Sequence, residues 1–183
     1  MDGYGAARVY EESDLLATEE EVLTAIGRIA AEMTLELHEC DPVLLCCMTG
    51  GIVFAGQLLT RLNFPLQVDY VHATRYGHGI HGEALDWKMK PSTQLSGKTV
   101  VLIDDILDVG VTLASIAEYC RLMGAERVLM AVLIEKLHLR KVTPGMRADF
   151  SGLEIGDRFL FGYGLDYHGY WRNAPGIYAI KGQ

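Results

Sequence analysis

Three carboxylates stand within five positions near the middle of the chain, at Asp104, Asp105 and Asp108, and Gly110 and Thr112 follow them closely. Backbone N–H groups at a helix start bind phosphate without any lysine. Carboxylates instead suit hydroxyl groups, Mg²⁺ or a proton. A ligand that carries both a phosphate and a diol, such as a ribose 5-phosphate, would satisfy both halves of this segment.

The residues on either side predict how this segment is held. Four consecutive apolar residues at 100–103 are typical of a buried parallel strand. Residues 113–123 form an amphipathic helical pattern that ends at Gly124. We therefore expect a strand, an acidic turn and a helix capped by Thr112, with the turn at the carboxyl edge of an open α/β sheet, where ligands bind.

Other interpretations of this segment are weaker. The letters Asp-Asp-Ile-Leu-Asp also match the diphosphate motif of prenyl synthases, but that motif requires a long helix, and an apolar strand precedes it here. A phosphate P-loop requires lysine where Val111 stands, and the dinucleotide pattern G-x-G-x-x-G is absent. A solvated acidic turn without function remains the plainest alternative.

A second strand–turn–helix unit precedes the first. Residues 43–48 predict a buried strand, Gly50 and Gly51 follow Thr49, and residues 52–62 predict a helix. Paired glycines let backbone N–H groups converge on an anion, although Gly-Gly often serves only as a turn. Residues 66–73 and 127–134 predict two further strands.

Lys136 follows the strand predicted at residues 127–134. A lysine at the carboxyl end of a central strand points into the same crevice as the acidic turn. The alternative is a surface lysine that merely ends the strand.

The N-terminal part of the chain predicts packing rather than chemistry. Thr18 and Glu21 form a capping box, and the helix that follows carries apolar residues at helical spacing. Residues 1–18 have no strong pattern, and residues 7–10 could form a short edge strand. The apolar positions of the helix are Val22, Ile26, Ile29, Met33 and Leu37.

Composition limits the classes of protein that fit. The 183 residues are 50% hydrophobic and 22% charged, which is ordinary for one globular domain and wrong for disorder. A formal net charge of -8 argues against general binding to nucleic acid or anionic membranes. The four cysteines lack metal-ligand spacing, and no apolar run approaches the ~18 residues of a membrane helix. We expect a cytoplasmic protein with reduced thiols.

Residues 99–112 resemble the phosphoribosyl-diphosphate (PRPP) binding motif of the type I phosphoribosyltransferases. That motif has an apolar strand, two acids, two apolar residues, Asp, a small residue, Gly, any residue and Thr. The resemblance implies that Asp104 and Asp105 meet the ribose hydroxyls and that Asp108 accepts the N7 proton of a purine. The 5-phosphate would lie against the backbone of Asp108, Val109, Gly110, Val111 and Thr112, although the family usually has Thr or Ser at position 109.

The segment after residue 148 resembles the tail of the 6-oxopurine phosphoribosyltransferases, through Asp149-Phe150, Phe159, Gly162-Tyr163, Leu165-Asp166-Tyr167, Tyr170 and Arg172. The resemblance implies that Phe159 stacks on the base and that the Leu160 backbone reads its edge. Lys136 would donate to the 6-oxo group, which disfavours adenine. Asp166 would contact the base through its backbone and Mg²⁺ through its carboxylate, with Asp104 and Asp105 as the other metal ligands, and Arg172 would bind pyrophosphate.

The resemblance also assigns two loops. Thr49, Gly50 and Gly51 match the pyrophosphate loop, in which a non-proline cis peptide would join residues 48 and 49; many relatives carry Lys where this chain has Thr49. The glycine-rich stretch of residues 75–91 matches a mobile lid that begins at Arg75 and Tyr76 and excludes water from the reacting centre. Trp87 is expected to hold the far end of this lid.

Taken together, these patterns predict an α/β fold with a mostly parallel sheet flanked by helices. We expect a single domain over residues 1–183, with a core at about 19–145, a small hood from about 1–18 and 146–183, and a lid at about 75–91. The resemblance implies a purine salvage enzyme that uses Mg²⁺, transfers ribose 5-phosphate from PRPP to N9 of hypoxanthine or guanine, and forms a dimer or tetramer. The alternatives are a transferase acting on another base, a PRPP-sensing regulator that binds nucleic acid, and a scaffold without catalysis.

Overall fold

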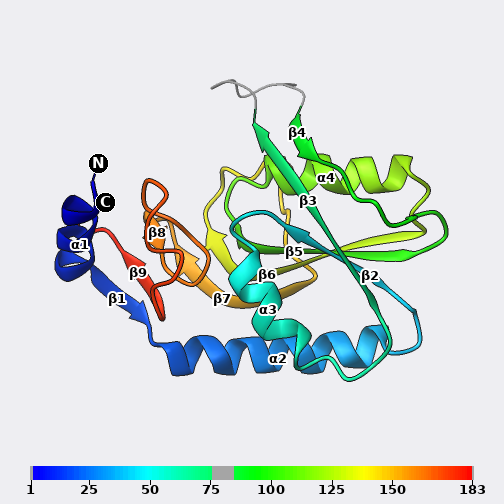
Figure 1. The fold of residues 1–183 in the computed structure, drawn as a ribbon, viewed down its shortest axis with the longest axis horizontal. Coiled ribbons are helices and arrows are strands. Elements are labelled where there is room, and N and C mark those ends of the chain that lie inside the picture. Colours follow the sequence, from blue (N-terminus) through cyan, green and yellow to red (C-terminus); the bar gives the residue numbers. More distant parts are fainter. Residues whose placement is uncertain (1, 76–84, 183) are drawn as a thin grey trace.

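The computed structural model describes residues 2–75 and 85–182. A six-stranded sheet lies at its centre, and Figure 1 shows its arrangement. The strand order is β4-β3-β2-β5-β6-β7, and all neighbours are parallel except the antiparallel pair β3–β4. The predicted α/β class with a mostly parallel sheet is confirmed. The strands are β2 (Val43–Cys47), β3 (Gln67–Arg75), β4 (Leu85–Met89), β5 (Thr99–Leu107), β6 (Arg127–Leu137) and β7 (Phe150–Gly156).

Helices cover both faces of this sheet. On β2, Leu44 and Cys46 pack in one apolar cluster, whereas Val43 and Leu45 pack in another, as the alternation of side chains along a strand requires. The first cluster includes residues of α2 (Glu19–Leu37) and α3 (Ile52–Leu59), and the second includes residues of α4 (Val111–Leu122). Both faces of the central strands are buried, and this explains why their sequences are continuous hydrophobic runs.

The long helix α2 begins as its sequence predicts. The Thr18 side chain accepts from the Glu21 N–H, and the Glu21 carboxylate accepts from the Thr18 N–H, so two otherwise unpaired donors of the first turn are satisfied. All five of the predicted apolar positions of this helix are buried.

The prediction of a strand at residues 7–10 is wrong. These residues lie in α1 (Gly3–Glu12), whose N-cap Asp2 accepts from the Gly5 N–H. The apolar residues that matter are Ala6 and Tyr10, which lie four positions apart on one helix face: Ala6 is buried, and Tyr10 stacks on Trp171 with ring centroids 4.6 Å apart. That partner is distant in sequence, so no local pattern reveals it.

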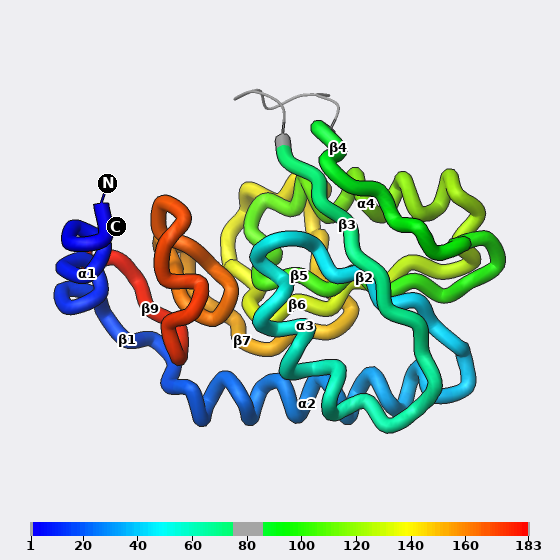
Figure 2. The backbone as a smooth tube through the Cα atoms, in the orientation of Figure 1, coloured from blue at the N-terminus to red at the C-terminus, as the bar shows by residue number. Residues whose placement is uncertain are grey.

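A second, antiparallel sheet forms a hood at one end of the molecule. Its order is β1-β9-β8, and Figures 1 and 2 show it beside α1, where both ends of the chain lie. Aromatic side chains hold it together: Trp171 donates to the Ala6 carbonyl at 2.6 Å, and Phe161 stacks on Tyr178. The three strands are β1 (Asp14–Ala17), β8 (Leu160–Phe161) and β9 (Ile177–Ala179).

The hood begins later than residue 146. Strand β7 pairs in parallel with β6, from Ala131 with Phe150 to Leu137 with Gly156, and so extends the large sheet. Residues 138–149, which precede β7, are rich in charged and turn-forming residues. This composition is typical of a loop, so the sequence pattern does not predict the strand that follows.

The predicted lid is only partly a loop. Leu85–Met89 form β4, which pairs antiparallel with β3, and Trp87 lies opposite Ala73. The Trp87 ring packs against Tyr119 of α4 with centroids 4.7 Å apart, which is consistent with the expected anchoring at this end. Tyr76 and the rest of the segment to residue 84 lie outside the described residues.

All four cysteines are free, and Cys46, Cys47 and Cys120 are buried, which agrees with the expectation of reduced thiols. Burial raises the pKa of the Cys46 thiol to about 12, and the nearby Asp104 and Asp105 carboxylates add to this rise. Within the described residues, none of the helices is both long enough and apolar enough to cross a membrane.

Candidate active site

A cleft of about 410 Å³ opens at the carboxyl end of the central strands. Strand β2 pairs with β5 only as far as Ile103, whereas β5 continues along β6 to Leu107. The end of β5 therefore has a free edge, and the cleft lies along it. The lining comprises Met48, Thr49, Gly50, His72, Ala73, Thr74, Asp104, Asp105, Ile106, Asp108, Val109, Gly110, Thr112, Leu113, Leu160, Leu165, Asp166 and Arg172.

Asp104 and Asp105 belong to strand β5 and not to the predicted turn, because pairing with β6 keeps the chain extended to Leu107. They are also deeply placed: Asp105 is buried, and its N–H donates to the Asp104 carboxylate at 3.0 Å. Burial, reinforced by the neighbouring Asp105 charge, raises the pKa of Asp104 well above its ordinary value, and burial also raises the pKa of Asp105.

The Thr49-Gly50-Gly51 loop lies against these carboxylates, and the peptide bond between Met48 and Thr49 is cis, as expected. A Cβ atom at Gly50 would lie 2.0 Å from Asp105 Oδ2, and one at Gly51 would lie 2.6 Å from the Ile103 carbonyl oxygen. Both positions therefore require glycine for close packing.

The amides of this loop are not equivalent. Gly51 N–H donates to the Cys47 carbonyl at 3.0 Å, whereas among the described residues Thr49 and Gly50 N–H have no acceptor. Any anion bound here through loop amides would therefore use Thr49 and Gly50, and the expected contribution of the Gly51 amide is not supported.

Helix α4 begins next to the acidic strand end. Its N-cap is Gly110 in the left-handed conformation, with φ 86°, and Thr112 is the second helical residue, so the prediction that Thr112 caps the helix is wrong. Within the described chain, the N–H groups from Val109 to Thr112 have no acceptor. This run of free donors at a helix N-terminus is suited to a phosphate.

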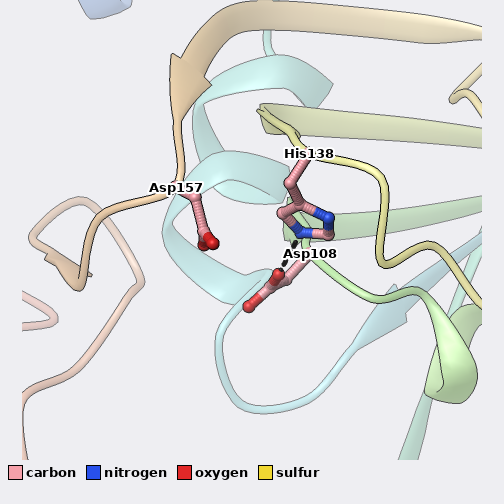
Figure 3. Close-up of side chains that lie close together, drawn as sticks. All are labelled: Asp108, His138 and Asp157. Carbon is pink, nitrogen blue, oxygen red and sulfur yellow. Dashed lines mark hydrogen bonds and ion pairs between the residues drawn. The ribbon is translucent and has the colours of Figure 1, made fainter.

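Asp108 contacts two basic side chains, Lys136 near the end of β6 and His138 just after it, and Figure 3 shows the His138 contact. Its Oδ1 lies 2.6 Å from His138 Nε2, and its Oδ2 lies 3.4 Å from Lys136 Nζ. Lys136 Nζ also lies 3.6 Å from Asp157 Oδ1. Partial burial alone would raise the pKa of Asp108, but the hydrogen bond to His138 and the Lys136 charge outweigh it and leave the pKa below its ordinary value.

His138 and Asp157 were missed from the sequence. Lys136 was recognised at the end of its strand, and alternation along an extended chain places the side chain two residues later on the same side. That signal could have identified His138. Asp157 lies after β7, a strand that sequence reasoning did not find, so no comparable signal was present.

Hood residues close the other side of the cleft. Arg172 pairs with Asp166 through Nη2 and Oδ1 at 2.6 Å and donates to the Gly164 carbonyl at 2.6 Å. Asp166 Oδ2 accepts from the Gly169 N–H at 2.7 Å. Phe159 is 43% exposed, and its ring meets Tyr167 edge-on with centroids 5.7 Å apart.

The structure brings most of the predicted site residues to one cleft. Lys136 lies beside it, next to Asp108, and is reached through a neighbouring hollow. Val111, Gly51 and Phe159 do not line it, and Arg75 ends β3. The predicted residues that line the cleft are Thr49, Gly50, Asp104, Asp105, Asp108, Val109, Gly110, Thr112, Leu160, Asp166 and Arg172.

The predicted metal ligands do not form a three-ligand cluster. In the described part of the chain, the group whose ligand atoms approach within 4.8 Å of one another is Asp108, His138 and Asp157. Asp104 and Asp105 nevertheless line the cleft, and carboxylate oxygens are the ligands that Mg²⁺ prefers, commonly one or two of them completed by water and substrate phosphates.

This fold and cleft match known proteins. Residues 13–168 match the phosphoribosyl transferase domain family, and the chain belongs to that family. It is 30% identical over 168 residues to a hypoxanthine-guanine phosphoribosyltransferase of Bacillus subtilis, which covers 91% of this chain and 92% of that protein.

Two further phosphoribosyltransferases resemble the chain over most of its length. A hypoxanthine-guanine-xanthine phosphoribosyltransferase of Tritrichomonas foetus is 27% identical over 167 residues, covering 91% of each chain. The solved structure of a hypoxanthine phosphoribosyltransferase of Staphylococcus aureus superposes with a TM-score of 0.87 at 27% identity, covering 94% of each chain.

Gly50→Ala tests the close contact beneath the cleft. The new methyl group would meet the Asp105 carboxylate, so we expect a loss of about 1–3 kcal/mol in the free energy of unfolding, measured by urea denaturation. Gly56→Ala is the matched control, because a Cβ there meets nothing within 4 Å and alanine favours the helix by about 0.5–1 kcal/mol. Equal effects of the two substitutions would contradict the packing described.

Asp104→Asn tests the buried charge. Because the folded state raises the pKa of Asp104, stability falls as pH rises from the ordinary value through the raised one. The amide side chain of the Asp104→Asn variant does not ionise, so this loss of stability at high pH disappears. Its carbonyl oxygen can still accept from the Asp105 N–H. We expect the ligand-free variant to melt about 2–4 °C higher at pH 8, with the gain shrinking toward pH 4.

Asp86→Asn, at an exposed position on β4, is the control and should leave the melting temperature unchanged at both pH values. A less stable Asp104→Asn variant at pH 8 would show that the carboxylate is compensated in the ligand-free protein.

Proposed function

We propose that this protein transfers the 5-phosphoribosyl group of PRPP to N9 of hypoxanthine or guanine and releases pyrophosphate. The observation that supports this most directly is the pairing of Lys136 Nζ with Asp108 Oδ2 at 3.4 Å. A 6-oxopurine that reacts at N9 presents O6, an acceptor, beside N7–H, a donor. Lys136 donates to the first and Asp108 accepts from the second.

Adenine fits this pair poorly. It presents an amino group where the 6-oxopurines present an acceptor, and an ammonium group can only donate. Ion pairs with Asp108 at 3.4 Å and Asp157 at 3.6 Å hold the Lys136 ammonium group beside the proposed base site. A site that must hydrogen-bond an oxo group rejects the analogue that lacks it.

We assign the sugar phosphate to the part of the cleft at the start of α4. The N–H groups from Val109 to Thr112, which have no acceptor within the described ranges, would hold the 5-phosphate at the N-terminus of α4. Asp104 and Asp105 would accept from the ribose hydroxyls. The Thr49 and Gly50 amides, with Arg172, would hold the pyrophosphate.

The donor set fits Mg²⁺. Asp104 and Asp105 would hold the ion directly or through water, and it would neutralise part of the charge that raises their pKa values. When bound, the ion supplies positive charge to the pyrophosphate leaving group. Asp166 is a weaker candidate, because Arg172 and Gly169 N–H engage its two carboxylate oxygens.

The chain's own residues then act in order. Arg172 and the loop amides stabilise charge on the leaving pyrophosphate as the sugar becomes oxocarbenium-like. Asp108, a carboxylate whose pKa lies below its ordinary value, accepts the N7 proton as N9 attacks. Arg75 and Tyr76 would begin a lid that excludes water during this step.

We also propose that the chain is a single catalytic domain and assembles as a homodimer or homotetramer in the cytoplasm. A PRPP-sensing regulator that binds nucleic acid is less well supported, because the net charge is -8.

The test is a transfer assay with PRPP, Mg²⁺ and each of hypoxanthine, guanine, xanthine and adenine. We expect nucleotide and pyrophosphate from hypoxanthine or guanine, with kcat/KM for adenine lower by at least about 100-fold. The assay also ranks the 6-oxopurines. Equal use of adenine, or no turnover of any base, would contradict the proposal.

Asp108→Asn tests the proton acceptor. The amide keeps the size of the side chain but cannot take the N7 proton, so we expect kcat to fall by about 100- to 10,000-fold while the KM for PRPP changes little. An unchanged kcat would remove Asp108 from this role.

A further inference from the structure

His138 lies one residue beyond the end of β6, and its side chain is only 6% exposed. Both ring nitrogens are engaged: Nε2 lies 2.6 Å from Asp108 Oδ1, and Nδ1 lies 3.1 Å from the Arg140 backbone N. Figure 3 shows the ring directed at the Asp108 carboxylate. A buried imidazole with both nitrogens bonded is held in one orientation.

These contacts define the tautomer. A backbone N–H can only donate, so His138 Nδ1 accepts from Arg140 and carries no proton. The proton of the neutral ring is therefore on Nε2, where it is donated to Asp108 Oδ1. This fixes one carboxylate oxygen of Asp108 and leaves Oδ2 on the side of Lys136.

The same residues do not form a convincing metal site. Asp108, His138 and Asp157 lie close enough to share a cation, but Lys136 Nζ lies within 3.6 Å of both carboxylates. Arg140 adds a second positive charge on Asp157 at 2.5 Å. The two cationic side chains already balance the carboxylates and would repel a metal ion.

We propose that His138 is a positioning residue that holds Asp108 in the orientation required to accept the purine N7 proton. This rests on the proposed phosphoribosyl transfer. Without the bond to Nε2, the Asp108 carboxylate would be free to turn both oxygens toward Lys136, which would occupy the donor intended for the base. Arg140 contributes through its backbone N–H, which keeps Nδ1 unprotonated.

Charged groups from several elements face this pair. Lys136 comes from β6, Asp157 follows β7, and Lys141 Nζ donates to the Leu107 carbonyl at the end of β5. Because the His138 hydrogen bond lowers the pKa of Asp108, its removal raises that pKa. Activity requires ionised Asp108, so the acid limb of the kcat–pH profile moves to higher pH.

The experiment compares three substitutions in the full-length protein by steady-state transfer from PRPP to hypoxanthine. His138→Leu removes the donor, His138→Gln retains an N–H at a similar reach, and His138→Asn carries the same amide too short to reach. We expect about a tenfold lower kcat for His138→Leu and His138→Asn, a KM for PRPP within about twofold, and partial recovery in His138→Gln. The control His38→Gln, on an exposed residue at the end of α2, should match wild type.

The outcomes separate the two proposals. If wild type turns over no base, the proposed function fails. If wild type is active but His138→Leu keeps its kcat and pH profile, the positioning role fails. Should His138→Leu not fold, the comparison of His138→Gln with His138→Asn decides, because equal kcat values for those two would also overturn it.

The tautomer gives a readout that does not depend on activity. In protein labelled with ¹⁵N-histidine, we expect the His138 signals to report a protonated Nε2 and an unprotonated Nδ1 at neutral pH, assigned by their loss in His138→Gln. A proton on Nδ1 instead would contradict the donation to Asp108.

Discussion

The site depends on a close approach of three backbone segments around one buried carboxylate. Gly50 lies so near Asp105 that a Cβ atom would meet Oδ2 at 2.0 Å, and Gly164 of the hood lies so near Gly50 that its Cβ would meet the Gly50 carbonyl at 2.3 Å. Arg172 then bonds the Gly164 carbonyl and Asp166. The sheet, the loop and the hood can therefore approach one another closely only because Gly50 and Gly164 have no side chains. The cleft lies between these three segments.

This arrangement explains how an acidic protein can bind a polyanionic substrate. The net charge is -8, yet the groups assigned to the phosphates are mostly backbone N–H groups, at Thr49, at Gly50 and at the start of α4. Such dipoles are fixed by the fold and do not depend on the overall charge. The raised pKa values of Asp104 and Asp105 mean that their ionised forms lower the stability of the fold, which is consistent with a site whose stability and ligand affinity oppose each other.

Much of this could be predicted from local patterns, and the failures have a physical cause. The strand and helix around Asp108 and the capping box at Thr18 are encoded by adjacent residues, so composition and spacing were sufficient. Helix α1 depends on a partner far along the chain, Trp171 for Tyr10, and strand β7 follows a segment rich in charge and turn residues that hides it from local patterns. Alternation from Lys136 could have pointed to His138, but its role comes from a contact with Asp108, thirty residues away, which no local pattern shows.

The central claim is that free amides at the start of α4 hold a sugar phosphate beside Asp104 and Asp105. A crystal structure with a purine nucleoside 5'-monophosphate tests it most directly. The account predicts the phosphoryl group against the backbone of residues 108–112, the ribose hydroxyls at the two carboxylates and the base edge at Lys136. A phosphoryl group bound anywhere else would contradict it.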